Sequence, residues 1–160
     1  MKTALIIIDM INGMEKWISK NRMKKTITNL KLVVEKARKK KIPIIYVVHK
    51  PLGKGRIKIY DEIKPVKNDK IVFKNNYSSF YKTKLDEILK RKKIKNLVIA
   101  GVSTHWCVLT TVVDASYRNY KITLLDDCTA APSKRWENFA KEWLDNTLTL
   151  GIKKSNQKIW

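Results

Sequence analysis

Three residues, Asp9, Lys74 and Cys107, carry the chemical groups needed for acyl transfer, although they lie far apart in the sequence. A cysteine thiol becomes a nucleophile when it loses its proton, and a nearby carboxylate can accept that proton as a general base. An ammonium group and the first turn of a helix both favour the thiolate, and we expect a helix to begin at Cys107. Free backbone N–H groups at such a helix start can also hold an oxyanion.

Each of these residues also has a simpler interpretation. A lone cysteine is most often a small buried apolar side chain. A charge that closes a strand is often only a loop residue, and one lysine among so many says little. It is the occurrence of all three at matching strand ends that favours a catalytic site.

Apolar runs alternate with helical patterns along the chain. The predicted strands cover residues 3–9, 43–49, 70–74, 96–101 and 121–126, with a short last strand at 152–155. The predicted helices cover residues 29–41, a segment capped by Ser78 or Ser79, residues 107–120, and residues 132–148 with Trp136, Phe139 and Trp143 as anchors. Residues 50–69 mix prolines and glycines with charges, which indicates a long loop.

This alternation predicts an α/β fold, a three-layer α-β-α sandwich with a mainly parallel, doubly wound sheet. The length suits one domain over residues 1–160. Right-handed crossovers place all carboxyl ends of the strands at one edge, where open α/β sheets bind ligands. Asp9 and Lys74 close the first and third strands and Cys107 follows the fourth, so this topology can bring them together.

The chain is strongly basic, with 35 Lys and Arg against 14 Asp and Glu, a net charge of +21. Such a charge attracts polyanions in a salt-dependent way. Local runs occur at residues 39–41 and 90–93, but no zinc-finger spacing or aromatic RNA-binding strand accompanies them. We therefore expect nucleic acid to bind only by non-specific charge attraction.

The cysteine count and the apolar runs indicate the cellular compartment of the protein. Two cysteines exclude a disulfide scaffold and favour a reducing environment. No secretory signal is visible, and no apolar run approaches the roughly 18 residues that span a bilayer. We expect a cytoplasmic protein with no membrane association.

Three segments in order carry a family resemblance: residues 5–12 (LIIIDMIN), 74–80 (KNNYSSF) and 101–108 (GVSTHWCV). Residues 118–123 (RNYKIT) fit the run into the next strand. Together they resemble the isochorismatase-like cysteine hydrolases, which include nicotinamidases, carbamoyl-sarcosine amidases and ureidoacrylate-type amidases. The resemblance covers nearly the whole chain.

The resemblance implies a catalytic triad of Asp9, Lys74 and Cys107. It also implies a cis peptide bond between Val102 and Ser103, with the amides of Ser103 and Cys107 as the oxyanion hole. In that family's mechanism the aspartate deprotonates the cysteine, the thiolate attacks a carbonyl carbon, and water hydrolyses the thioester. The lysine stabilises the site electrostatically. The expected enzyme is a hydrolase that cleaves a C–N bond, other than a peptide bond, of a small amide or ureido compound.

Where the sequence departs from the family's patterns, some of the family's activities are not expected for this chain. Nicotinamidases have an Asp-x-His metal site after the second strand, whereas here that strand ends in His49, Lys50 and Pro51. We therefore expect no metal and no cofactor, and interpret His49 as a polar strand-end residue. Isochorismatases proper lack the cysteine, so Cys107 argues against their vinyl-ether chemistry.

The walls of the pocket are expected from residues 10–20, 50–69 and 128–135. Candidate aromatic lining residues are Trp17, Tyr46, Tyr77 and Trp106. Cys128 is expected to be a buried filler.

Assembly and the competing functions remain open. The family commonly forms oligomers, so we expect a homo-oligomer, a dimer or a tetramer, with Trp136, Trp143 and Trp160 as candidate interface residues. The alternative function is a basic nucleic-acid-binding module or a non-catalytic assembly module on the same fold. The intact triad weighs against the second of these.

Overall fold

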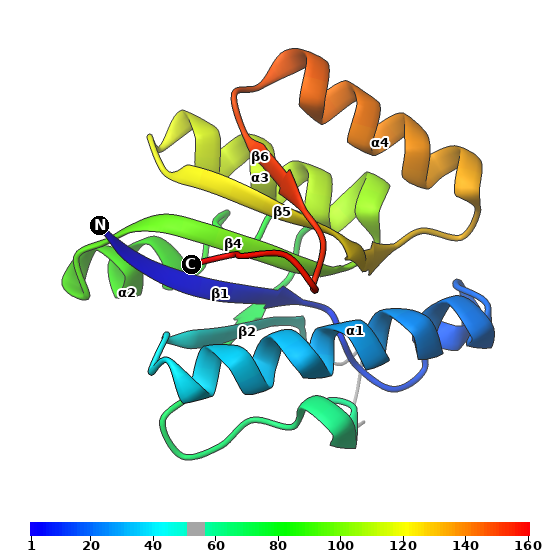
Figure 1. The fold of residues 1–160 in the computed structure, drawn as a ribbon, viewed down its shortest axis with the longest axis horizontal. Coiled ribbons are helices and arrows are strands. Elements are labelled where there is room, and N and C mark those ends of the chain that lie inside the picture. The colour runs from blue at the N-terminus through cyan, green and yellow to red at the C-terminus, as the bar shows by residue number, and fades with distance from the viewer. Residues whose placement is uncertain (51–56) are drawn as a thin grey trace.

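A single parallel sheet organises the chain in the computed structural model, which describes residues 1–50 and 57–160. The strand order is β3-β2-β1-β4-β5-β6 (Figure 1). The strands are β1 (Lys2–Ile8), β2 (Ile44–His49), β3 (Lys70–Lys74), β4 (Ile94–Val102), β5 (Lys121–Ala130) and β6 (Gly151–Lys153). The helices are α1 (Lys20–Lys39), α2 (Leu85–Arg91), α3 (Leu109–Tyr117) and α4 (Lys134–Thr147). This arrangement confirms the predicted α/β class.

Helices cover both faces of the sheet, as Figure 1 shows with α1 on one side and α3 and α4 on the other. Because successive strand residues point to opposite faces, β1 contributes to two cores. Leu5 and Ile7 face the core under α1, and Ala4, Ile6 and Ile8 face the core under the other helices. Burial on both faces is the physical reason for the uninterrupted apolar run in this strand.

The winding of the sheet reverses between β1 and β4. The chain moves outward from β1 to β2 and β3, returns to β4 on the other side of β1, and continues to β5 and β6. The carboxyl ends of β1 and β4 therefore flank the crevice at which doubly wound sheets bind ligands.

A glycine lets these two strands approach closely. Gly101 has φ +120°, and a β-carbon at this position would lie 2.0 Å from the carbonyl oxygen of Ile8. No other residue type fits here without moving β4 away from β1.

The first helix is longer than predicted. It begins at Lys20, nine residues before the predicted start at Asn29, with Ser19 at its N-cap position. Its buried stripe includes Met23 and Thr26 as well as the predicted apolar positions from Ile27 onward. The first turns of this helix could not be predicted from the apolar pattern, because lysine and arginine outnumber apolar residues there.

Two predictions about the other helices are wrong. Trp136, Phe139 and Trp143 are exposed, and α4 instead buries Glu137, Ala140 and Leu144. The helix is turned this way because the Glu137 carboxylate lies among the cationic groups of Arg22, Lys134 and Lys141.

The N-cap of α2 is Lys84 rather than Ser78 or Ser79. Those serine hydroxyls instead bind α3, at Asp114 and Thr111.

Within the predicted loop over residues 50–69, the part that the structure describes contains a short turn and a bridge. Residues 51–56 lie outside the described residues, and a 3-10 turn, η2, covers Asp61–Ile63. Ile59 pairs with Ile11 in an isolated bridge, which holds this segment against the residues that follow β1. In the described part of the chain, none of the helices combines the length and apolar character needed to cross a membrane.

Candidate active site

Asp9 follows the last residue of β1 and is almost fully buried. Its φ of +49° is a left-handed conformation that aspartate tolerates better than most residues. The amide of Asp9 continues the sheet by donating to the Val47 carbonyl at 2.9 Å. Its carboxylate is fixed from the neighbouring strand, because the backbone N–H of His49 donates to Oδ1 at 2.8 Å.

Lys74 is the last residue of β3, and its side chain is fully buried. The Nζ atom lies 2.8 Å from Oδ2 of Asp9 and donates to Sγ of Cys107 at 3.3 Å. It also lies within hydrogen-bond distance of two backbone carbonyls, those of Asn76 and Tyr77, at 3.1 and 3.3 Å. These contacts replace the water that a buried ammonium loses, and they aim it between the carboxylate and the thiol.

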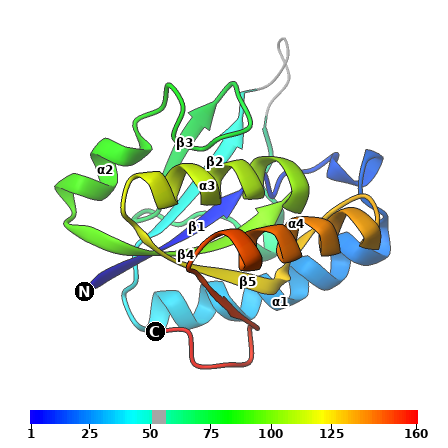
Figure 2. The same cartoon turned by 90° about the horizontal axis from the view of Figure 1, so that it is seen from above.

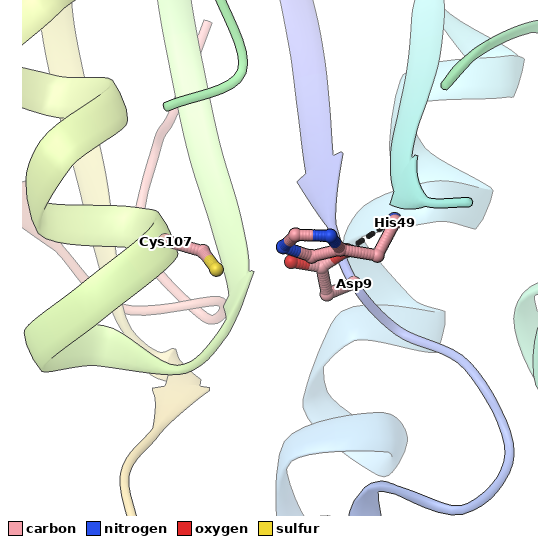
Figure 3. A group of neighbouring side chains, drawn as sticks. All are labelled: Asp9, His49 and Cys107. Carbon is pink, nitrogen blue, oxygen red and sulfur yellow. Dashed lines mark hydrogen bonds between the residues drawn. The ribbon is translucent and has the colours of Figure 1, made fainter. Parts of the chain in front are cut away.

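Cys107 lies in a π-helical turn, η3 (Thr104–Val108), that leads into α3. Such turns are rare and occur frequently at functional sites. Trp106 and Val108 donate their amides to the Ser103 carbonyl, which ties the turn to the end of β4. Figure 3 shows the thiol pointing from this turn toward the side chains of Asp9 and His49.

The peptide bond between Val102 and Ser103 is cis. It directly precedes the turn that carries Cys107. The Ser103 hydroxyl and the Nδ1 atom of His105 lie 2.9 Å apart. The His105 ring stacks on Trp136 and lies at a tilt against Trp106. The contact with His105 therefore holds Ser103 beside Cys107, in addition to the backbone hydrogen bonds from Trp106 and Val108.

The electrostatics of the thiol differ from the sequence expectation. Burial, reinforced by the negative charge of Asp9, raises the pKa of Cys107 to about 12, and Lys74 opposes this shift only in part. A lowered pKa was expected from the helix start and the ammonium. The pKa is raised instead because the thiol is buried and an Asp9 carboxylate oxygen lies within 4.8 Å of it.

Transfer of the Cys107 proton to Asp9 avoids the cost of adding a net negative charge to the buried site. Together, Asp9, Lys74 and Cys107 hold one negative and one positive charge whether the proton lies on sulfur or on the carboxylate. Proton transfer from Cys107 to Asp9 therefore adds no net charge to the buried site, unlike release of the proton to water.

A cavity of about 210 Å³ lies in front of the thiol. Asp9, His49, Ser103 and Cys107 line it on the polar side. The apolar lining residues are Ile11, Met14, Trp17, Tyr77, Val102, Trp106 and Pro132. Residues from 10–20 and 128–135 thus contribute as expected, and Trp17, Tyr77 and Trp106 lie at the cavity.

Tyr46 was wrongly expected in this lining. It is fully buried on the α1 face, where its hydroxyl donates to the Ile63 carbonyl at 2.6 Å. Its position in β2 places it on the opposite face from the cavity, which the strand alternation could have revealed.

His49 lies at the site, although from the sequence it was interpreted only as a polar strand-end residue. One ligand atom from each of Asp9, His49 and Cys107 lies within 4.8 Å of the others. Burial and the charge of Lys74 lower the pKa of His49, so its imidazole is neutral at neutral pH. The signal that could have found it is its place at the end of β2, next to β1.

These three residues do not form a good resident metal site. Both carboxylate oxygens of Asp9 are already engaged, one by the His49 amide and one by Lys74. The lysine ammonium also lies 3.3 Å from the sulfur and repels a cation at the same place.

Comparisons with known proteins identify relatives that share the sequence and the fold of this chain. Residues 3–150 match the isochorismatase domain family model. The uncharacterized isochorismatase family protein YaaI of Bacillus subtilis is 33% identical over 98% of this chain and 96% of its own length. The crystal structure of N-carbamoylsarcosine amidase from Thermoplasma acidophilum covers 100% of both chains, with 30% identity and a TM-score of 0.86.

More distant relatives extend the comparison. Ureidoacrylate amidohydrolase RutB of Agrobacterium fabrum is 38% identical over 44% of this chain, which spans only 31% of that protein's length. The nicotinamidase/pyrazinamidase PncA of Bacillus subtilis has 20% identity and a TM-score of 0.86 over 96% of this chain and 100% of its own, a likeness of fold alone.

Proposed function

The chain belongs to the isochorismatase family, and from this membership we propose that it is a metal-independent cysteine hydrolase that cleaves a C–N bond of a small amide or ureido compound. The observation that carries the proposal is the Lys74 ammonium, which contacts both Asp9 and Cys107 in a buried site. Amidase relatives of the same fold support the bond type.

In the first step Cys107 gives its proton to Asp9 and its sulfur attacks the carbonyl carbon of the substrate. Lys74 stays within hydrogen-bond distance of the sulfur and stabilises the thiolate. The carbonyl electron pair moves onto oxygen, and the backbone amides of Ser103 and Cys107 are the proposed donors to this oxyanion.

In the second step the tetrahedral intermediate collapses. The proton held on Asp9 passes to the leaving nitrogen, the C–N bond breaks, and ammonia or an amine departs from a thioester on Cys107. Asp9, again a carboxylate, then takes a proton from water, which attacks the thioester carbon. The acid product leaves, and the proton returns to the Cys107 sulfur.

The cavity limits the size of the substrate. A volume of about 210 Å³ equals roughly seven water molecules at about 30 Å³ each. Most of its lining is apolar or aromatic. We therefore expect a compact compound whose reacting amide faces Cys107 and whose remaining part packs among Trp17, Tyr77 and Trp106.

The test is ammonia release from a panel of small amides, including formamide, ureidoacrylate and N-carbamoylsarcosine. The wild-type protein should release ammonia from at least one compound, and Cys107→Ala should release none while unfolding at the same temperature. Cys128→Ala is the matched control and should keep turnover. Retained turnover in Cys107→Ala would remove the mechanism.

We also propose a homo-oligomer that uses the exposed aromatic face of α4. Trp136, Phe139 and Trp143 are all more than a third exposed and lie along this helix. Trp160 does not share that surface, because it packs against the core under α1. Sedimentation should show a dimer or larger species that Trp136→Ser with Phe139→Ser reduces to monomer. A wild-type monomer at working concentration would end this proposal.

A further inference from the structure

A second, larger cavity lies at the opposite edge of the sheet from Asp9 and Cys107. It has a volume of about 830 Å³ and lies where β1 and β4 begin, next to Lys2, Thr3 and Ile94. Figure 2 shows that both chain termini and the ends of α1 and α2 gather at this end of the molecule. The length of β1 separates the two cavities, so a ligand here does not contact the catalytic residues.

The side chains that line this cavity carry positive charge and no negative charge in the described part of the chain. Lys2, Lys41, Arg91, Lys92 and Lys93 line it, and no aspartate or glutamate does so in the described part of the chain. Arg91 has one exposed partner, Glu87, at 3.8 Å. Among residues 1–50 and 57–160, no carboxylate lies within 4.0 Å of the four lysine nitrogens. The charges therefore remain available to an anion.

Parts of two basic runs that are distant in the sequence meet here, namely Lys41 and residues 91–93. Residues 39–41 end α1 and residues 90–93 end α2. Positively charged side chains near a helix C-terminus interact favourably with the helix dipole. This explains why lysines occur at these helix ends, but not why they converge on one cavity. Lys41 and Lys93 both have φ +56°, a left-handed position usually given to glycine or asparagine.

One side of the cavity is apolar and partly aromatic. Its apolar lining residues are Ile42, Pro43, Ile94, Ile159 and Trp160. The indole of Trp160 is half-buried, and an aromatic ring of this kind stacks on planar bases. Asn96 also lines the cavity, and its Oδ1 atom is buried without a hydrogen-bond donor in the described structure. This side therefore offers a stacking surface.

We propose that this cavity binds a nucleoside phosphate, with its phosphates among the lysines and its base against Trp160. The charges select a multiply charged anion, and the apolar side selects one that carries a planar group. The volume lies within the range of small-molecule sites, which is roughly 300–1,000 Å³. A free nucleotide and the phosphorylated end of an RNA strand present this same chemistry.

Calorimetric titration with ATP in EDTA, at about 150 mM salt, tests the proposal. One ATP should bind per chain, and adenosine and inorganic triphosphate should each bind at least about tenfold more weakly, because each lacks one part of the ligand. A 5′-phosphorylated adenine oligoribonucleotide distinguishes the sources. If it binds more tightly than ATP and competes with it, the ligand is an RNA end; otherwise it is the free nucleotide.

Three lysines with the same backbone conformation supply the matched variants. Asn tolerates positive φ, so Lys41→Asn and Lys93→Asn remove charge with little change to the backbone, and each should weaken ATP binding by about fivefold. Lys82→Asn is the control, because Lys82 has φ +52° but does not line the cavity. Cys107→Ala should bind ATP normally.

Three results would overturn the proposal. ATP binding that does not saturate would leave only general charge attraction. An equal loss of affinity in Lys82→Asn would likewise leave only general charge attraction. Triphosphate binding as tight as ATP binding would exclude stacking on Trp160.

Discussion

The ammonium nitrogen of Lys74 lies 2.8 Å from the Oδ2 atom of Asp9, and both side chains are almost completely buried. Such a pair is costly to desolvate, and removing one partner leaves the other charge buried without compensation. Here the pair also fixes the electrostatics of the thiol beside it. Stability and reactivity therefore depend on the same contact, and variants can separate the two.

Lys74→Met should destabilise the protein by about 3–5 kcal/mol, because it leaves the Asp9 carboxylate buried and unpaired. Urea unfolding measures this loss. The double variant Asp9→Asn with Lys74→Met removes both charges and should recover most of the stability while remaining inactive. A loss below about 1 kcal/mol in the single variant would contradict the buried pairing.

Gly101→Ala should be far more damaging than Gly13→Ala. A β-carbon at Gly101 would meet the Ile8 backbone at 2.0 Å and force β4 away from β1 next to the site. Gly13 has φ +97° but no atom within 4 Å of its added β-carbon, so only backbone strain of about 1–2 kcal/mol applies. Thermal unfolding should rank the variants in this order, and similar melting temperatures would argue against the close strand contact.

Zinc should inhibit the enzyme, and EDTA should not. Asp9, His49 and Cys107 offer three ligand atoms within 4.8 Å, so added Zn²⁺ can compete for the thiolate and the carboxylate. His49→Gln keeps the backbone N–H that holds Asp9 but removes one ligand. It should raise the inhibition constant for zinc by about tenfold, measured by ammonia release. Loss of activity in EDTA would instead indicate a resident metal.

Leu144→Ala and Trp143→Ala test the orientation of α4. Leu144 is fully buried, so its truncation should cost about 2–5 kcal/mol in urea unfolding. Trp143 is 38% exposed and should cost much less in the monomer. The reverse order would mean that the tryptophans anchor the helix, as the sequence pattern first indicated.

The strands, and the proximity of Asp9, Lys74 and Cys107, could be predicted from the sequence because both depend on strong local signals. The uninterrupted β-branched run that ends at Asp9 marks a strand buried on both faces. Lys74 ends β3, a short apolar edge strand that is buried on one face only. Parallel topology then brings those ends together. The helix predicted over residues 107–120 is present too, since α3 covers Leu109–Tyr117.

Features that depend on tertiary charge contacts could not be predicted. The orientation of α4 follows from Glu137, whose cationic partners include Arg22, 115 residues away in the sequence. The raised pKa of Cys107 follows from burial and from Asp9 rather than from its own helix. The convergence of Lys41 and residues 91–93 on one cavity likewise required the packed fold.

The pH dependence of iodoacetamide labelling, followed at Cys107 and Cys128 by mass spectrometry, tests the proposed triad most directly. Wild-type Cys107 should be labelled through its cavity, whereas fully buried Cys128, whose pKa burial also raises, should remain unlabelled. Asp9→Asn removes a charge that raises the pKa of Cys107, so its labelling should begin at lower pH while hydrolysis is lost. Lys74→Met removes the opposing charge and should shift labelling to higher pH. Equal inertness of the two cysteines, or shifts of the same sign in both variants, would contradict the proposed triad.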